Sequence, residues 1–259
     1  MVFLYSSIKA KRLLWVMVAV SLFYGTSHAG SLADTITAVK PGVVGVGTVQ
    51  KSRRPPSILM GTGFVVGDGL HALTNAHVIP ETLDEKKREQ LAVFSGEGDH
   101  ARVHPARVIS IDEDHDIALL EFSNGPLPAL TLGDDRNVRE GDRVAFTGFP
   151  LGGVLGLYPS TNRGIVSAIS PIVIPAARGR QVDRKIIERL HDPYPVFQLD
   201  ATAYPGHSGS PLYDPLTGHV VGIVNMVFVK GTKEHAITDP SGITYAIPIR
   251  HAKRLLGER

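Results

Sequence analysis

The stretch Gln198-Leu-Asp-Ala-Thr-Ala-Tyr-Pro-Gly-His-Ser-Gly-Ser-Pro-Leu212 places a serine, Ser208, in a turn rich in glycine and proline. Glycine adopts backbone angles that are costly for other residues, so such a turn can bring backbone N–H groups together beside the serine hydroxyl. Converging N–H groups stabilise negative charge that develops on an oxygen atom. The stretch therefore predicts a nucleophilic serine beside an oxyanion hole formed by the N–H groups of Gly206 and Ser208.

Two upstream segments supply what a nucleophilic serine needs, because its hydroxyl is weak until a base accepts the proton. Thr74-Asn-Ala-His-Val78 offers His77, and an imidazole can accept a proton and return it near neutral pH. His115-Asp-Ile-Ala-Leu-Leu120 offers Asp116, whose carboxylate could orient that imidazole. Each residue alone has an ordinary structural explanation. Together, in the order His77, Asp116, Ser208, they follow the order of chymotrypsin-type triads.

The composition is that of an ordinary globular protein, with 259 residues of which 43% are hydrophobic and 20% charged. The chain has no cysteine, which excludes disulfides and thiolate metal sites. Eleven histidines are present, but they form no His-Glu-x-x-His motif and no closely spaced His/Asp set. No glycine pattern matches a nucleotide-binding loop. We therefore expect neither a metal nor another cofactor.

The N-terminal segment resembles an export signal. Lys9, Lys11 and Arg12 precede an apolar run from Leu13 to Tyr24, and Ser27-His-Ala29 resembles a cleavage site. We predict a signal peptide at residues 1–29, cleavage after Ala29, and a periplasmic or secreted product. The run is shorter than the roughly 20 apolar residues that span a bilayer, so a membrane tether is expected only if this segment stays uncleaved.

The charge balance indicates neither nucleic acid nor an anionic membrane as a partner. The formal net charge is +2, and removing the three basic residues of the signal segment from the 27 leaves 24 basic against 25 acidic side chains. Such a balance creates no strong field of either sign. The expected partner is a protein or peptide substrate, and the sequence does not indicate the oligomeric state.

Most of the remaining chain has the pattern of short strands separated by Gly, Pro and Asp turns, after a short helix that Ser31 would cap. The first series of expected strands is Val43–Val49, Gly63–Val66, Leu70–Thr74, Leu91–Phe94, Arg102–Ile111 and Ile117–Phe122. The second series is Asp142–Gly148, Gly164–Ile169, Val196–Leu199, Pro211–Tyr213, His219–Val229 and Ile243–Ile247. A tail with helical spacing follows at 248–256.

A polar stretch, Gly133–Gly141, separates the two series. We therefore predict an all-β unit at residues 30–259, built from one barrel at about 40–135 and a second at about 140–248. The predicted base and acid fall in the first barrel and the nucleophile in the second, so the site is expected in the cleft between them. Two charged segments, Pro80–Gln90 and Pro175–Pro195, are interpreted as surface insertions that are either solvated loops or loops that gate the site.

The chain resembles the protease domain of trypsin-like serine proteases of the bacterial HtrA (Deg) kind. The matching segments are Gly61-Thr-Gly-Phe64, Leu73-Thr-Asn-Ala-His-Val78, Asp116-Ile-Ala-Leu-Leu120, Leu132-Gly-Asp134, Gly141-Asp142, Gly148-Phe-Pro150, Gly164-Ile-Val-Ser-Ala168, Asp200–Leu212, Val221-Gly-Ile223 and Tyr245-Ala-Ile-Pro248. The resemblance implies a trypsin-like double β-barrel with its active site in the inter-barrel cleft, and peptide-bond hydrolysis through an acyl-enzyme. It places the triad on His77, Asp116 and Ser208, and the oxyanion hole on Gly206 and Ser208.

Three departures from the family pattern stand out. His207 replaces the usual Asn before the nucleophile, which leaves two interpretations: a ring that titrates between pH 5 and 8 beside the oxyanion turn, or a side chain that only packs there. Ser210 replaces the usual Gly, and a larger side chain there could constrain the backbone. The family typically carries PDZ domains after the protease, whereas we expect this chain to be a protease domain without them.

By analogy with the family, the base of the primary specificity pocket lies near Thr202, and its wall lies near Asn225 and Met226. Because no acid stands at Thr202, we expect small or medium apolar side chains before the scissile bond rather than Arg or Lys. The leading hypothesis is a serine endopeptidase of exported or unfolded proteins that forms an acyl-enzyme on Ser208. The alternatives are a protease-like protein-binding module, such as a chaperone or scaffold, with little or no hydrolysis, and an esterase-like or self-processing activity.

Overall fold

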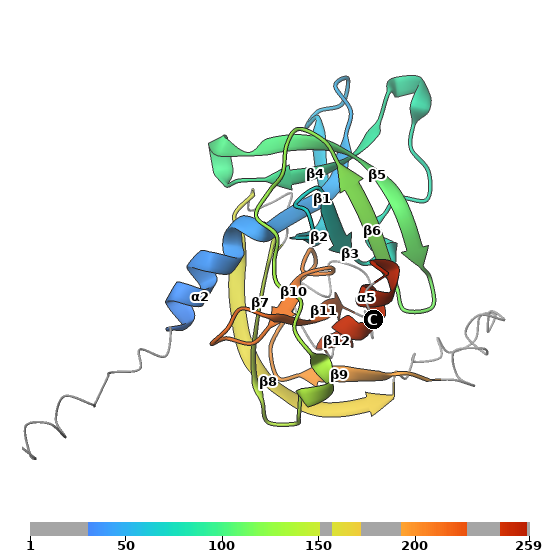
Figure 1. The fold of residues 1–259 in the computed structure, drawn as a ribbon. Helices are drawn as coiled ribbons and strands as arrows, with labels where there is room; N and C mark the ends of the chain where they lie inside the picture. The colour runs from blue at the N-terminus through green and yellow to red at the C-terminus, as the bar shows by residue number, and fades with distance from the viewer. Residues whose placement is uncertain (1–30, 151–156, 172–192, 227–243, 258–259) are drawn as a thin grey trace, which may run out of the picture.

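The computed structural model describes residues 31–150, 157–171, 193–226 and 244–257 (Figure 1). The predicted signal peptide and most of the charged segment 175–195 lie outside the described residues. The described strands form two closed antiparallel barrels of six strands each, which confirms the predicted fold class. None of the helices in these ranges is long and apolar enough to cross a membrane.

The first barrel closes in the order β1-β2-β3-β6-β5-β4. Its strands are β1 (Val43–Val49), β2 (Ser57–Val66), β3 (His71–Thr74), β4 (Gln90–Ser95), β5 (Arg102–Asp112) and β6 (Ile117–Phe122). Alternate residues of each strand point inward, so Val44, Val46, Val65, Val93 and Leu120 meet in one buried cluster. β2 begins six residues before the predicted Gly63, because the segment from Ser57 pairs with the far half of β1.

The second barrel closes in the order β10-β11-β12-β9-β8-β7. Its strands are β7 (Arg143–Gly148), β8 (Ser160–Pro171), β9 (Pro195–Leu199), β10 (Pro211–Tyr213), β11 (Val220–Met226) and β12 (Thr244–Pro248). Phe146, Val166, Phe197, Leu212 and Val224 contribute to its interior. The predicted strand His219–Val229 extends past Met226 into residues that the structure does not describe.

A third buried cluster joins the barrels. Phe64 and Ile117 of the first barrel pack in it with Tyr213 and Ile247 of the second. Burial of large apolar side chains contributes about 1.5–3 kcal/mol each, so this shared cluster holds the barrels in a fixed relation. That relation matters because the predicted catalytic residues come from both barrels.

Two α-helices flank the barrels. α2 (Leu32–Val39) follows Ser31, whose side chain forms a capping box with Asp34, as the sequence predicts. α5 (Ile249–Leu255) follows the last strand of the second barrel but also contacts β5 and β6 of the first (Figure 1). Five 3-10 helices lie among the described connections: η1 (Lys40–Gly42), η2 (Ala76–Val78), η3 (Glu85–Lys87), η4 (Gly98–His100) and η5 (Asp135–Asn137).

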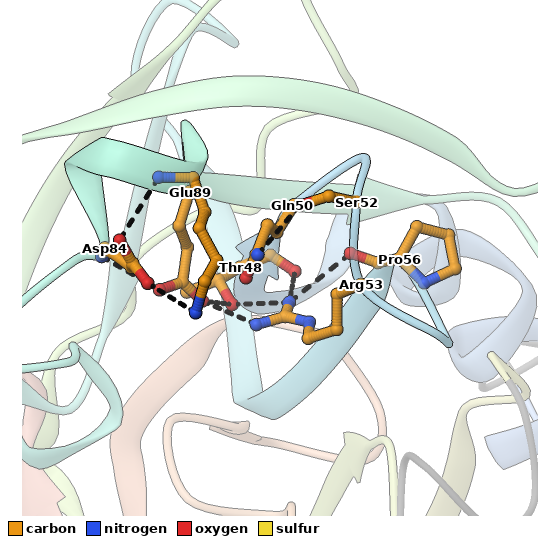
Figure 2. Close-up of polar contacts among 8 residues, drawn as sticks. Thr48, Gln50, Ser52, Arg53, Pro56, Asp84 and Glu89 are labelled. Atoms are coloured by element: carbon orange, nitrogen blue, oxygen red, sulfur yellow. Dashed lines mark hydrogen bonds and ion pairs between the residues drawn. The ribbon is translucent and has the colours of Figure 1, made fainter.

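The charged segment 80–90 is anchored to the first barrel rather than simply solvated. Figure 2 shows Glu89 accepting hydrogen bonds from Thr48 Oγ1 (2.7 Å) and Arg53 Nη1 (2.6 Å), and from the N–H of Asp84 (3.1 Å). These bonds, the one from Thr48 first, lower the pKa of Glu89. The network ties the β1–β2 connection to the segment before β4. It does not include any residue of the predicted triad.

Candidate active site

The predicted base and acid lie side by side because their strands are neighbours. η2, which contains His77, directly follows β3, and Asp116 directly precedes β6, with Thr74 paired to Ala118. His77 Nδ1 lies 2.6 Å from Asp116 Oδ2, and the backbone N–H of His77 donates to Asp116 Oδ1 at 2.9 Å. The carboxylate therefore contacts both the ring and the main chain of His77. This leaves Nε2 as the ring nitrogen that can face a nucleophile.

Asp116 has a left-handed backbone conformation, with φ of 54°, that is uncommon for a residue with a side chain. The surrounding structure over-determines this conformation, as expected where local strain persists. Its carbonyl accepts hydrogen bonds from the N–H of Ala76 (3.1 Å) and from Asn75 Nδ2 (3.0 Å). The sharp turn at Asp116 directs the carboxylate back toward η2 instead of along β6.

Asn225 joins the acid from the second barrel. Its Nδ2 donates to Asp116 Oδ2 at 2.8 Å, the same oxygen that faces the ring of His77. The sequence analysis assigned Asn225 to the wall of the specificity pocket, whereas in the structure its amide serves the carboxylate. In the sequence, the available signal was a polar residue that interrupts the apolar run of β11. In the structure, 7% of the surface of Asn225 is exposed.

The predicted nucleophile turn has the hydrogen bond and the residue types of a type II turn. The N–H of His207 donates to the carbonyl of Tyr204 at 3.0 Å, and Gly206 follows Pro205 with φ of 101°. Ser208 comes next and is 7% exposed. Within the described part of the chain, the N–H groups of Gly206 and Ser208 donate to no acceptor. These are the two donors that the sequence assigned to the oxyanion hole.

Thr62 of β2 fixes the nucleophile turn from the first barrel. Its N–H donates to the carbonyl of Ser208 at 2.9 Å, and its hydroxyl donates to the carbonyl of Gly206 at 2.7 Å. The same hydroxyl accepts from the N–H of Phe149 at 3.0 Å. A Cβ on Gly209 would lie 2.0 Å from the carbonyl oxygen of Thr62, so only glycine fits there. Sequence reasoning did not identify Thr62 as part of the site.

The segments that carry the three predicted triad residues meet at this point. Gly209 donates to the carbonyl of Val224 at 2.9 Å, and Val224 directly precedes the asparagine that holds Asp116. A Cβ on Gly61 would lie 2.7 Å from the side chain of Val78 and 3.0 Å from the carbonyl oxygen of Ser208. The hydrogen bonds of His77 within the described residues involve its N–H and Nδ1 and leave its Nε2 without a partner.

His207 is wholly buried, and the interpretation that it titrates between pH 5 and 8 is wrong. Its ring meets Phe146 edge-on at 5.3 Å between centroids, and burial lowers its pKa to about 4. Nδ1 lies 2.9 Å from the backbone nitrogen and 3.2 Å from the carbonyl oxygen of Tyr204, so the ring is held against the start of the turn. His207 therefore supports the oxyanion turn as a neutral side chain at physiological pH.

Ser210 is accommodated by a glycine on a neighbouring strand. A Cβ on Gly148 would lie 2.0 Å from Ser210 Oγ, so the absence of a side chain at Gly148 makes room for the hydroxyl. Among the described residues that buried hydroxyl has no hydrogen-bond partner. Ser210 nevertheless keeps its main-chain bonds, because its N–H donates to His207 and its carbonyl accepts from Val224. The Ser210 side chain is therefore compatible with the hydrogen bonds of this turn.

Of the remaining predicted pocket residues, Thr202 shares its hollow with no triad residue. Thr202 is exposed and lines a shallow hollow of about 520 Å³ with residues of β8, β9 and β12. Met226 ends β11, next to Asn225. A larger hollow of about 1150 Å³ lies between the start of α2 and the strands β7 and β8. No triad residue lines either hollow, and no group of three or more possible metal ligands occurs among the described residues.

Comparison with known proteins yields consistent relatives. The family described as "Trypsin-like peptidase domain" matches residues 61–223. A "Probable periplasmic serine endoprotease DegP-like" of Halomonas elongata is 32% identical over 190 residues, covering 73% of this chain and 33% of that protein. "Serine protease HTRA1" of Xenopus tropicalis is 29% identical over 231 residues, covering 88% of this chain and 42% of that protein.

Solved structures show the same likeness. The structure titled "HtrA-type protease AlgW with tripeptide" matches with a TM-score of 0.62 and 26% identity, covering 88% of this chain and 63% of that one. A serine endoprotease from Yersinia pestis matches with a TM-score of 0.61 and 25% identity, covering 88% of this chain and 66% of that one. The chain thus spans between a third and a half of the length of these two curated relatives.

Proposed function

Since this chain belongs to the trypsin-like peptidase domain family, we propose that it is a serine endopeptidase with His77, Asp116 and Ser208 as its triad. The observation that carries the proposal is the double hold of Asp116 on His77, reinforced by Asn225 across the barrel interface. A carboxylate held this way fixes the tautomer of the ring and stabilises the imidazolium that forms during catalysis.

The proposed reaction follows from these positions. Nε2 of His77 takes the proton of Ser208 as its oxygen attacks the substrate carbonyl, and the N–H groups of Gly206 and Ser208 receive the oxyanion. His77 then passes the proton to the leaving amine, which leaves an acyl group on Ser208. Water hydrolyses that ester by the same proton transfers in reverse. The assignment is supported by these two N–H groups, which have no acceptor among the described residues, and by the neutral His207 beside them.

We further propose that the substrates are exported or unfolded proteins. One relative is named as periplasmic, and one similar structure is titled as holding a tripeptide. The N-terminal pattern adds to this proposal a signal peptide at 1–29 with cleavage after Ala29, followed by one protease domain at 30–259. For specificity, Thr202 and Met226 remain proposed pocket positions, with Asn225 shared between the pocket wall and the acid.

Incubation with denatured casein tests the proposed function. Protein purified from the periplasm or medium of the expressing cells should cleave casein into fragments. Ser208→Ala should lower the turnover by about 10⁶, as deletion of a comparable nucleophile does. N-terminal sequencing of the same preparation checks cleavage after Ala29. Fragments that persist with Ser208→Ala would refute the assignment of the nucleophile. Suppressed casein aggregation without fragments would instead support a protein-binding module.

A further inference from the structure

Three aromatic rings from distant parts of the chain pack together directly beside the predicted acid. The rings of His115 and His251 are stacked, with centroids 3.9 Å apart and planes 26° from parallel. Tyr194 lies against both, at 4.6 Å from His115 and 5.1 Å from His251. His115 directly precedes Asp116, whereas His251 belongs to α5, which follows the last strand of the second barrel.

His115 is built into the turn that presents Asp116. The carboxylate of Asp112 accepts the N–H of His115 at 3.0 Å and lies 2.7 Å from its Nδ1. The N–H of Asp116 reaches the carbonyl of Glu113 at 3.4 Å, a long bond that closes the turn weakly. Because Asp116 has a left-handed conformation, this short turn needs support from outside itself.

His251 provides a flat surface for that turn. It is 5% exposed, and among the described residues neither of its ring nitrogens has a hydrogen-bond partner. Hydrogen bonding therefore does not explain why a histidine occupies position 251, whereas the contact of its ring with His115 does. The neighbouring residues Ile249 and Ala252 anchor α5 in the core shared by the two barrels, which makes the ring a rigid support.

The charges around His251 keep its ring neutral. Burial lowers its pKa to about 4, and His115, Arg254 and Arg250 act in the same direction, while Asp112 opposes them. Arg250 is held away by its contact with the buried Asp135. A neutral His251 ring stacks on His115 without adding a positive charge to the cluster.

We infer that His251 is a positioning residue for the triad: its ring, stacked on His115, holds the turn at residues 112–116 so that Asp116 keeps its two hydrogen bonds to His77. The inference rests on the proposed function for its catalytic consequence, but the geometry it describes exists without catalysis. It makes the C-terminal helix of the second barrel a support for the acid of the first.

The experiment compares two replacements of His251 with a matched control. His251→Leu keeps an apolar side chain but removes the flat ring, and His251→Phe keeps a ring. His104→Leu is the control, because His104 is also buried in the first barrel, at 3% exposure, but lies at the opposite end of β5, bonded to Ser95. All variants are also prepared with Ser208→Ala, which prevents self-digestion during spectroscopy.

The first measurement is the proton NMR resonance of the hydrogen-bonded Nδ1–H of His77. We expect His251→Leu to broaden or lose this resonance through faster exchange, while His251→Phe and His104→Leu retain it. The second measurement is hydrolysis of a peptide taken from a casein cleavage site. We expect His251→Leu to lower kcat about tenfold with KM within about twofold, because a misplaced acid affects the chemical step more than binding. His251→Phe should recover most of kcat.

A folded His251→Leu protein with the wild-type resonance and the wild-type kcat would overturn the inference and leave His251 as packing. If His251→Leu does not fold, His251→Met takes its place, because it also lacks a flat ring and leaves the contact of His115 with Asp112 intact, and the same two measurements decide in the same way. If the wild-type protein shows no hydrolysis that depends on Ser208, the proposed function is refuted but the inference about His251 is not. The His77 resonance still tests whether the stack holds Asp116.

Discussion

Thr62 and Asn225 each connect one barrel to a proposed catalytic segment of the other, and the two connections differ in kind. Thr62 of the first barrel reaches the nucleophile turn and binds only its backbone, at the carbonyls of Gly206 and Ser208. Asn225 of the second barrel reaches Asp116 and binds its side chain. The proposed nucleophile is thus positioned through the path of its main chain, and the proposed base through the direction of a carboxylate.

This difference predicts that removing the two connections has different effects on stability and catalysis. Loss of a bond to the backbone of the turn should change the stability of the turn first and the chemistry second. Loss of a bond to the carboxylate should change the chemistry first, because a hydrogen bond to a charged group is worth about 1.5–3 kcal/mol and acts on the group that orients the base.

The largest effect is expected at the carboxylate itself. Asp116→Asn keeps the shape but presents an amide to His77, which favours the wrong tautomer, so kcat should fall by about 10⁴. Steady-state hydrolysis of a casein-derived peptide measures this change. Circular dichroism provides the control for folding. A loss of less than tenfold in a folded protein would show that Asp116 does not orient the base.

The connection from the second barrel should contribute less. Asn225→Ala removes the donor to Asp116 Oδ2, and we expect kcat to fall by about 10- to 100-fold, in line with one hydrogen bond to a charged group. Measuring kcat and KM separately sharpens the comparison, since Asn225 was also expected near the specificity pocket. A rise in KM with unchanged kcat would show that Asn225 acts on substrate binding instead.

The connection from the first barrel should appear mainly in stability. Thr62→Val keeps the shape but leaves the carbonyl of Gly206 and the N–H of Phe149 without their partner, so the free energy of unfolding should fall by about 2 kcal/mol. Urea unfolding measures it, and Thr62→Ser, which keeps the hydroxyl, is the matched control. Equal stability of the Val and Ser variants would contradict a role for the hydroxyl.

The smallest effect concerns pH. The pKa of His207 is lowered from 6.5 to about 4, so between these values the unfolded chain binds a proton that the folded protein does not. Stability is therefore retained above pH 6.5 and lost as the pH falls toward 4. His207→Asn should reduce this loss by about 1 kcal/mol, measured as the unfolding free energy at pH 7 and pH 5.5. A loss of the wild-type size in the variant would show that His207 is already protonated in the fold.

The sequence predicted the triad from three local motifs in a recognisable order, since each residue alone has an ordinary structural explanation. His77, Asp116 and Ser208 stand in local patterns that depend only on neighbouring residues, and the alternation of apolar residues indicated the barrels. The roles of Thr62 and Asn225 depend on which strands meet across the barrel interface, and no local pattern contains that information. Asn225 interrupts an apolar strand, which marks it as unusual without naming its partner.

The departures from the family pattern needed three-dimensional context for the same reason. Ser210 fits because Gly148, distant in the sequence, has no side chain. His207 does not titrate near neutrality because its ring is buried against Phe146. In both cases the deciding neighbour comes from β7, and the sequence around the turn gives no indication of it.

Covalent labelling with a fluorophosphonate tests most directly whether segments from both barrels create one reactive hydroxyl. We predict one adduct on Ser208 in the wild-type protein, identified by peptide mass spectrometry, and strongly slowed labelling of the folded His77→Ala variant. An unlabelled Ser208 in folded wild-type protein, or labelling of His77→Ala at the wild-type rate, would contradict the account.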